Sequence, residues 1–326
     1  MPVNCKLIEV PNAQHGFFNR QPHCTTMSDH VARFVAGGGQ PGKGRAGPGN
    51  RSGAQPGGTP KSRAFPAKSF LRYCIGAQKA GTSWLYRFLS AHPECHMRPI
   101  KELHYFDALD RDDTKWQIGR FRKLQRRLAD AEDGQEKITA YDELIALLAK
   151  GRVDAAGYLG YLTKGRGAQK VVADVTPSYA LLSAERFKSM AEMAAHTRFI
   201  YILRDPVARL WSHIRMKARN RHGRGGSMQD WANRIFWRME RGRNAGILER
   251  GDYRTVLENL RQAVDPKQML VLFYEDLFTS DTTNRICRFL GIAPHPADYA
   301  QAVNPGAKIE MTAEQRDVAY GWHAQQ

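Results

Sequence analysis

The stretch FLRYCIGAQKAGTSW, residues 70–84, decides the fold. Residues 70–75 form a short apolar run that predicts a strand, and residues 83–91 predict an amphipathic helix. The loop between them contains Gly76 and Gly81, which allow the backbone to curl closely around an anion. Loop N–H groups and the helix dipole would then attract that anion, so this order of elements is typical of a phosphate-binding loop.

Apolar runs alternate with amphipathic stretches throughout the rest of the chain from Phe70, and no internal repeat is visible. This alternation predicts β-α units around a sheet. The expected fold class is therefore α/β, a single domain with a central, mostly parallel sheet flanked by helices. Further strands are expected at residues 170–173, 198–203 and 268–274, and further helices at 184–195, 207–221, 228–241, 253–264 and 282–290.

Two segments of the chain depart from this alternation. Residues 31–60 contain ten Gly and four Pro with almost no apolar content, so we expect residues 1–68 to be a disordered basic tail before a domain at 69–326. Residues 108–167 are charged and helix-rich and predict a helical insertion beside the sheet, near the expected ligand cleft. Apolar residues recur there on one helical face, which favours a packing helix over a lid. They are Tyr141, Leu144, Ile145 and Leu148.

Composition limits the compartment and the class of partner. The 326 residues carry a net charge of +17, concentrated in residues 1–70 and 204–254, which suits nucleic acid, a membrane surface or an anionic ligand. The five cysteines are far apart and include no Cys-x-x-Cys pair, so we expect neither a disulfide framework nor a zinc site. Neither a signal peptide nor a run of about 20 apolar residues is visible, and we expect a cytoplasmic protein.

The lysine of the loop distinguishes it from the loop of nucleoside triphosphatases, in which Lys directly follows the second glycine. Here Lys79 lies inside the loop, and Gly81 is followed by Thr82. The segment resembles the donor loop Lys-x-Gly-Thr-Thr/Ser-Trp of sulfotransferases that use 3′-phosphoadenosine 5′-phosphosulfate (PAPS). By this resemblance PAPS is the co-substrate, 3′,5′-adenosine bisphosphate (PAP) is the product, and Trp84 stacks on adenine or belongs to the core. The donor-binding residues that it implies here are Gly76, Gln78, Lys79, Ala80, Gly81, Thr82, Ser83 and Trp84.

The run RFIYILRDPVARLWSH, residues 198–213, predicts a strand that leads into a helix. Pro206 suits the first helical turn and Asp205 the cap. Arg204 ends the strand and Ser212 lies about two turns into the helix, so both could contact one phosphate. This run is similar to the family segment Arg-x-Pro-x-x-Arg-x-x-Ser, which holds the 3′-phosphate. The resemblance covers about residues 68–320, and it implies that Lys308 lies in a loop that closes over the nucleotide.

Sulfuryl transfer, like phosphoryl transfer, requires an in-line acceptor and stabilisation of developing charge. Lys79 suits the bridging oxygen of the leaving nucleotide. The segment KELHYFD, residues 101–107, resembles the Lys-Glu-x-x-Phe-Phe segment of heparan- and polysaccharide-type sulfotransferases. This resemblance implies that Glu102 is the base for the acceptor proton and that His104 assists it. Small-molecule relatives use a histidine as the base, so the two roles could be reversed.

The acceptor side is less defined by the sequence. Residues 174–179, DVTPSY, follow a predicted strand and resemble a Thr-Pro-x-Tyr element that lines the acceptor cleft in relatives. Asp174 and Ser178 are therefore expected to contact the acceptor, although Asp174 could instead form a turn. We expect the acceptor to offer a hydroxyl or amine on a carbohydrate or glycolipid, and we expect no metal.

Three alternatives remain open from the sequence. A P-loop nucleotide kinase or triphosphatase would have a related fold, but it requires Lys after the second glycine and a strand-terminal Asp for magnesium. A polyanion-binding protein could use the basic helices, where five cationic side chains crowd together without a nucleic-acid motif. They are Arg215, Lys217, Arg219, Arg221 and Arg224. A donor-binding protein without activity is the third alternative.

Overall fold

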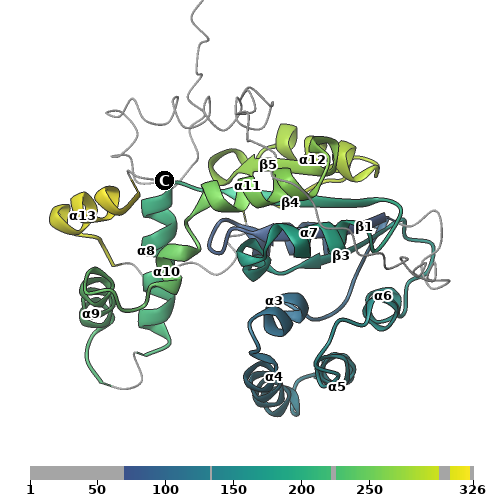
Figure 1. Cartoon of the computed structure of the whole chain (residues 1–326), viewed down its shortest axis with the longest axis horizontal. Coiled ribbons are helices and arrows are strands. Elements are labelled where there is room, and N and C mark those ends of the chain that lie inside the picture. Colours follow the sequence, from purple (N-terminus) through teal and green to yellow (C-terminus); the bar gives the residue numbers. More distant parts are fainter. Residues whose placement is uncertain (1–69, 133, 222–224, 301–308, 324–326) are drawn as a thin grey trace, which may run out of the picture. The chain divides into compact units, whose positions relative to one another are not determined.

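The strand that begins at Phe70 lies at the centre of a parallel sheet (Figure 1). The computed structural model describes residues 70–132, 134–221, 225–300 and 309–323, all within one compact unit. In these residues a five-stranded sheet has the order β2-β3-β1-β4-β5, and every neighbouring pair is parallel. The strands are β1 Phe70–Gly76, β2 Cys95–Met97, β3 Val171–Val175, β4 Thr197–Leu203 and β5 Met269–Phe273.

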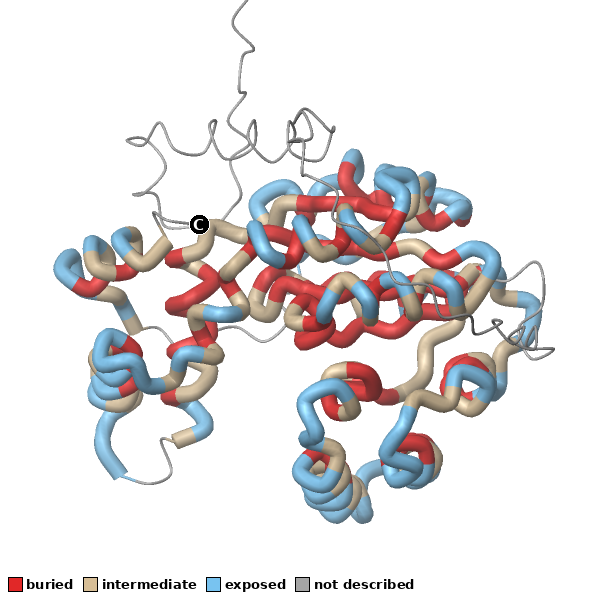
Figure 2. Tube along the Cα trace, viewed as in Figure 1, coloured by how far each residue is buried: buried red, intermediate tan, exposed pale blue. Residues whose placement is uncertain are grey.

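Helices connect the strands and flank the sheet, as parallel pairing requires (Figure 1). The residues of β1, β3 and β4 are buried along almost the whole length of these strands, whereas the helices contain both buried and exposed residues (Figure 2). The buried core therefore follows the sheet. The helices are α2 Thr82–Ala91, α3 Tyr105–Asp110, α4 Thr114–Leu128, α5 Gly134–Leu148, α6 Ala155–Thr163, α7 Ala184–Ala191, α8 Pro206–Arg219, α9 Met228–Glu240, α10 Gly246–Glu249, α11 Tyr253–Ala263, α12 Ser280–Leu290 and α13 Ala313–His323.

The order of the strands places three loops at one end of the sheet. β1 lies between β3 and β4, so the segments that follow these three strands meet where their carboxyl ends meet. In open α/β sheets, ligands bind in the crevice at this edge. The segment that contains Glu102 joins the same edge, because the Glu102 N–H donates to the Val175 carbonyl (3.2 Å) and the Leu103 N–H donates to Thr176 Oγ1 (2.9 Å).

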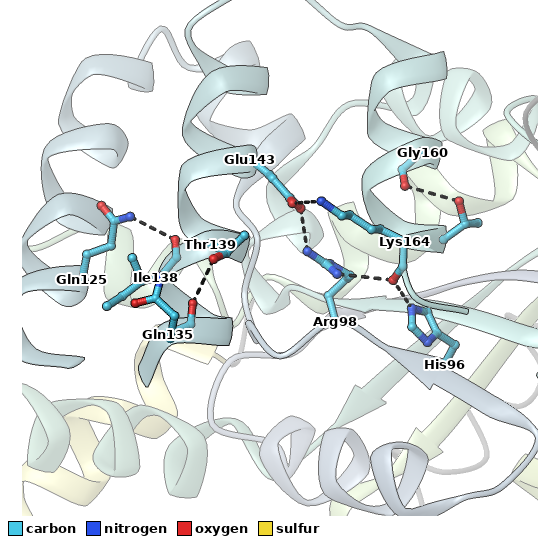
Figure 3. Close-up of polar contacts among 10 residues, drawn as sticks. His96, Arg98, Gln125, Gln135, Ile138, Thr139, Glu143, Gly160 and Lys164 are labelled. Carbon is cyan, nitrogen blue, oxygen red and sulfur yellow. Dashed lines mark hydrogen bonds and ion pairs between the residues drawn. The ribbon is translucent and has the colours of Figure 1, made fainter. Parts of the chain in front are cut away.

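Residues 108–167 form helices that are attached to the β2 edge of the sheet (Figure 3). Arg98, directly after β2, pairs with Glu143 of α5 (2.7 Å) and donates to the Lys164 carbonyl at the end of α6 (3.3 Å). The Lys164 ammonium pairs with the same Glu143 carboxylate. These contacts fix α5 and α6 against the sheet, and α4 packs on α5 through the Phe121 and Tyr141 rings, whose centroids are 5.1 Å apart.

The α/β fold class predicted from the sequence is confirmed. The four predicted strands and six predicted helices occur within a few residues of their expected bounds. On α5, Leu144 and Leu148 are buried, as the predicted helical face requires. β2 was not predicted, because a strand of three residues gives too short a run for period-two alternation. The predicted tail, residues 1–68, lies outside the described residues. No helix of the described chain is long and apolar enough to cross a membrane.

Candidate active site

The loop that follows β1 has a backbone fixed by local hydrogen bonds and by glycine. The Ala77 N–H donates to the Ile202 carbonyl of β4 (2.8 Å), and the Ala80 N–H donates to the Ala77 carbonyl (3.1 Å). Gly81 has φ +86°, and a Cβ there would lie 2.5 Å from Leu277 Cδ2. The loop therefore requires glycine at 81, and it leads directly into the N-terminus of α2.

This loop lines a cavity of about 600 Å³, which we call the loop cavity. Ser212 of α8 and Arg204 after β4 line the same cavity, so the structure brings together the two segments that the sequence analysis singled out. Lys79 also lines it; burial, then Arg219 and Arg204, lower the pKa of its ammonium. Of the predicted donor-binding residues, the loop cavity is lined by Gln78, Lys79, Gly81, Thr82, Ser83, Trp84, Arg204 and Ser212.

Two predicted donor-binding residues, Gly76 and Ala80, are not among those that line this cavity. Gly76 is the last residue of β1, and Ala80 is fully buried. Both residues therefore contribute to the conformation of the loop. Lys308 lies outside the described residues.

Arg204 is held in place from three sides. Its guanidinium donates to the Lys79 carbonyl (2.9 Å) and lies 4.1 Å from the centroid of the Tyr274 ring. Its own carbonyl accepts from the Tyr253 hydroxyl (2.9 Å). Arg204 thus links the end of β4 to the lysine of the loop, and it orients a cation along the cavity wall.

Trp84 is part of the buried core and also lines the loop cavity. It lines the loop cavity but is only 5% exposed, and its indole N–H donates to the Asp298 carbonyl (2.9 Å). Its ring stacks with Phe88 on one flank and with Tyr299, whose centroid is 6.2 Å away. Tyr299 lines the same cavity and is 39% exposed. An aromatic surface therefore forms part of the wall.

The loop cavity contains two further cations that the sequence analysis did not predict as donor-binding residues, and named only as part of a basic cluster. Arg215 and Arg219 of α8 line the cavity. They follow Ser212 by three and seven residues, which is the spacing of one helical face. That spacing was the signal that could have identified them.

A second cavity of about 580 Å³ adjoins the first. It is lined by residues of α4, α8 and the α10 region, and we call it the α4–α8 cavity. Ser178, for which the sequence analysis predicts an acceptor contact, lines this cavity. Five residues line both cavities, so the two spaces share one wall. These shared residues are Gln78, Glu102, Arg120, Met216 and Asn220.

Glu102 belongs to a chain of charged groups at this shared wall. Lys101 Nζ lies 2.5 Å from Glu102 Oε1, and His104 Nε2 lies 3.7 Å from Glu102 Oε2. His104 Nδ1 lies 2.7 Å from Asp107 Oδ2. Glu102 and His104 both have positive φ, 63° and 50°. The sequence analysis assigned the role of base to Glu102 with His104 as its helper, but it did not include Asp107.

The charges of this cluster stabilise one another. Burial opposes ionisation of Glu102, but contacts with His104 and Lys101 outweigh it and lower the pKa of the carboxyl. Burial also opposes the charged form of His104, but the carboxylates of Asp107 and Glu102 raise its pKa to about 9. At neutral pH the cluster therefore contains an ionised Glu102 beside an imidazolium.

We expect the stability of the protein to depend on His104 between pH 6.5 and 9. A pKa raised in the folded state stabilises the fold fully below the ordinary value of 6.5, and this contribution is lost as the pH rises through about 9. The loss corresponds to about 3 kcal/mol. Urea unfolding at pH 6 and pH 9.5 should show a fall in stability for wild type that exceeds the fall for His104→Gln by this amount. Equal falls in the stability of the two proteins would contradict the raised pKa of His104.

Asp174 lies in the core instead of in either cavity. It is 1% exposed, and its carboxylate accepts from Thr176 Oγ1 (2.6 Å), the Tyr158 hydroxyl (2.7 Å) and the Tyr179 hydroxyl (2.8 Å). Its position gives no support to the predicted acceptor contact. Thr176 in turn accepts from the N–H of Leu103, so this network holds the segment that carries Glu102.

Within the part of the chain that the structure describes, no group of three His, Cys, Asp or Glu side chains is arranged to hold a metal ion. The site contains cations, carboxylates and the two buried histidines His104 and His213. His213, which lines the α4–α8 cavity, is 3% exposed, and burial together with Arg209 lowers its pKa to about 2. It is therefore neutral beside several cations.

Known proteins resemble this chain in sequence pattern and in fold. The model of the Sulfotransferase family matches residues 73–296. A sulfotransferase from Alicyclobacillus acidocaldarius has a similar structure, with a TM-score of 0.51 at 19% identity over 78% of this chain and 91% of that chain. The sulfotransferase domain of the Synechococcus PCC 7002 olefin synthase gives a TM-score of 0.43 at 18% identity, over 78% and 87% of the two chains. No curated protein sequence matches significantly. Because the family model covers more than half of its residues, the chain belongs to the sulfotransferase family.

Proposed function

We propose that the protein transfers the sulfuryl group of PAPS to a hydroxyl or amine of a carbohydrate or glycolipid. The observation that carries this proposal is the shared wall of the two cavities. One cavity is lined by the glycine loop and by basic side chains, the other by polar and charged side chains, and Glu102 lines both. A donor in one and an acceptor in the other would meet beside a carboxylate.

The loop cavity suits a donor with phosphates at two ends. The loop and the N-terminus of α2 provide one anion site. Arg204 and Ser212 provide the second, from a different segment of the chain. An adenosine ring would lie against Trp84 and Tyr299. A nucleoside triphosphate carries its phosphates on one side only and does not require the second site.

In the transfer step the acceptor oxygen or nitrogen attacks sulfur, and the bond from sulfur to the bridging phosphate oxygen breaks. PAP leaves with the electron pair of that bond, and the positive charge of Lys79 stabilises the oxygen on which it collects. Lys79 is already desolvated, so its charge is screened less than it would be in water.

The acceptor proton passes to Glu102. The Glu102 carboxylate is ionised before the reaction, because its pKa is lowered. It lines both cavities, and this position between donor and acceptor supports its role as the base. His104 is protonated at neutral pH and carries no free lone pair to serve as base, since its pKa is raised to about 9. Its role is to hold the Glu102 carboxylate, with Asp107 fixing the ring from the other nitrogen.

Removing the second anion site should abolish recognition of the 3′-phosphate. We expect Ser212→Ala and Arg204→Ala to weaken PAP binding by about tenfold or more, because each loses a charge-assisted contact worth about 1.5–3 kcal/mol. Binding of 5′-AMP, which lacks the 3′-phosphate, should be almost unchanged in Ser212→Ala. Arg204→Ala also loses the bond to the Lys79 carbonyl, so Ser212→Ala is the cleaner variant. Calorimetric titration measures both ligands, and an equal loss for PAP and AMP would argue against this site.

Sulfuryl transfer itself is tested with radiolabelled PAPS and a panel of acceptors. The panel contains neutral and acidic oligosaccharides, a glycolipid, a phenol and a primary amine, each incubated with wild type and with Glu102→Gln. The proposal predicts label in a saccharide or glycolipid that depends on Glu102. Label only in the phenol or amine would overturn the carbohydrate assignment, and transfer that is unaffected in Glu102→Gln would overturn the assigned base.

A further inference from the structure

Two large hydrophobic side chains are exposed in the described residues, and each lines one of the two cavities. Tyr299 is 39% exposed and lines the loop cavity; Trp116 is 66% exposed and lines the α4–α8 cavity. An indole presents a large flat apolar face with one polar N–H, so an exposed indole at a cavity offers a contact surface to a ligand. Tyr299 already has a place beside Trp84, whereas nothing in the proposed chemistry uses Trp116.

Trp116 belongs to one face of α4 that lines the α4–α8 cavity. The lining residues Asp113, Trp116, Gln117 and Arg120 are spaced as i, i+3, i+4 and i+7. Arg120 lies over the Trp116 ring, with its guanidinium carbon 6.0 Å from the centroid. A helical face that is apolar at one position and polar at the others differs from the face of a packing helix, which is apolar throughout.

The α4 helix is held rigidly, which a binding surface requires. Gln125 of α4 donates to the Ile138 carbonyl of α5 (3.1 Å; Figure 3) and to the Asp142 carboxylate (2.7 Å). Figure 3 also shows α5 and α6 tied to the β2 edge through Arg98 and Lys164. The backbone of α4, which carries Trp116, therefore has a fixed position relative to Glu102 at the sheet edge.

Four carboxylates and four basic side chains line the α4–α8 cavity; they belong to Glu102, Asp107, Asp113 and Glu249, and to Arg111, Arg120, Lys217 and Arg250. Lys217 of α8 and Arg250 after α10 line it, and among the described residues neither is paired with a carboxylate. Arg250 donates to the Gly246 carbonyl (2.6 Å), and its Nε is buried without a partner. Two partly buried cations near each other are stabilised by an anion that binds between them.

We propose that Trp116 is a stacking platform for a sugar ring of the acceptor, and that Lys217 and Arg250 bind an anionic group of the same acceptor. This inference rests on the proposed function and narrows its acceptor to an acidic oligosaccharide. The carbon-bound hydrogens of a sugar ring suit the face of an indole, while its hydroxyls suit the amides and carboxylates around it. A phenol or an alkyl chain would leave those polar groups unsatisfied.

The inference is tested by calorimetry with PAP present at saturation. The probes are a glucuronic-acid-containing tetrasaccharide, the same tetrasaccharide with its carboxyls reduced to alcohols, and a glutamate decapeptide. Wild type is compared with Trp116→Ala, Trp116→Phe and Lys217→Ala. Arg122→Ala is the matched control, because Arg122 is an exposed cation of α4 that lines neither cavity.

The acidic tetrasaccharide should bind wild type, and the reduced form should bind about tenfold more weakly. Trp116→Ala should weaken both saccharides about tenfold, and Trp116→Phe should weaken them less. Lys217→Ala should weaken only the acidic one, and Arg122→Ala neither. Unchanged binding in Trp116→Ala, equally tight binding of the decapeptide, or no saccharide binding would overturn the inference. In each case retained PAP binding leaves the proposed donor site intact, whereas loss of PAP binding by wild type overturns the proposed function itself.

Discussion

Glu102→Gln should lower kcat about 100- to 10,000-fold while PAP still binds, because the amide cannot accept the acceptor proton. The change preserves the size of the side chain but removes the charge beside Lys101 and His104. His104 then loses one of the two carboxylates that raise its pKa. The measurement is a single-turnover transfer assay at saturating PAPS, with PAP affinity by calorimetry.

The pH dependence of this reaction separates the two candidate bases. If Glu102 accepts the proton, kcat stays high from pH 6 to 8 and falls as His104 loses its proton near pH 9. If a neutral His104 were the base, kcat would instead rise toward pH 9. Asp107→Asn provides the matched test, because it removes the larger of the contacts that raise the His104 pKa. The fall in kcat should then move to lower pH.

Lys79→Gln should lower kcat about 100- to 1000-fold, the loss typical for one group that stabilises charge in the transition state. The affinity for PAP should fall less, because the loop N–H groups, Arg204 and Ser212 continue to hold the nucleotide. Stabilisation of developing charge thus appears in kcat more than in binding.

Lys123→Gln is the control for this charge change, since Lys123 is exposed on α4 and lines neither cavity. It should leave kcat and PAP affinity unchanged. A Lys79→Gln enzyme with normal kcat and weakened PAP binding would show that Lys79 only binds the nucleotide. In that case the bridging oxygen would be stabilised by another group.

The two segments that line the loop cavity could be singled out from the sequence because each is local to one strand-to-helix junction. Gly76 to Trp84 follows one strand, and Arg204 to Ser212 follows another. Parallel pairing of β1 with β4 then brings the two junctions to one edge. Each junction could be identified from its own residues, and only the adjacency of β1 and β4 had to come from the fold.

The α4–α8 cavity could not be predicted in the same way. It brings Trp116 of α4 together with Lys217 of α8, two residues from elements that are far apart along the chain. In the sequence, Trp116 appears as one aromatic residue in a charged helical segment, with no pattern to show that it is exposed. Asp174 illustrates the opposite case, because a carboxylate after a strand suggests a cleft, whereas the surrounding Tyr158 and Tyr179 hydroxyls bury it.

The central claim, that the loop cavity binds a nucleotide phosphorylated at both ends, is tested most directly by one titration. Wild type is titrated by calorimetry with PAP, with 5′-AMP and with magnesium-ATP under the same conditions. The account predicts that PAP binds at least about tenfold more tightly than either of the others, since only PAP engages both the loop and the Arg204–Ser212 site. Tighter binding of magnesium-ATP, or equal binding of PAP and 5′-AMP, would contradict it.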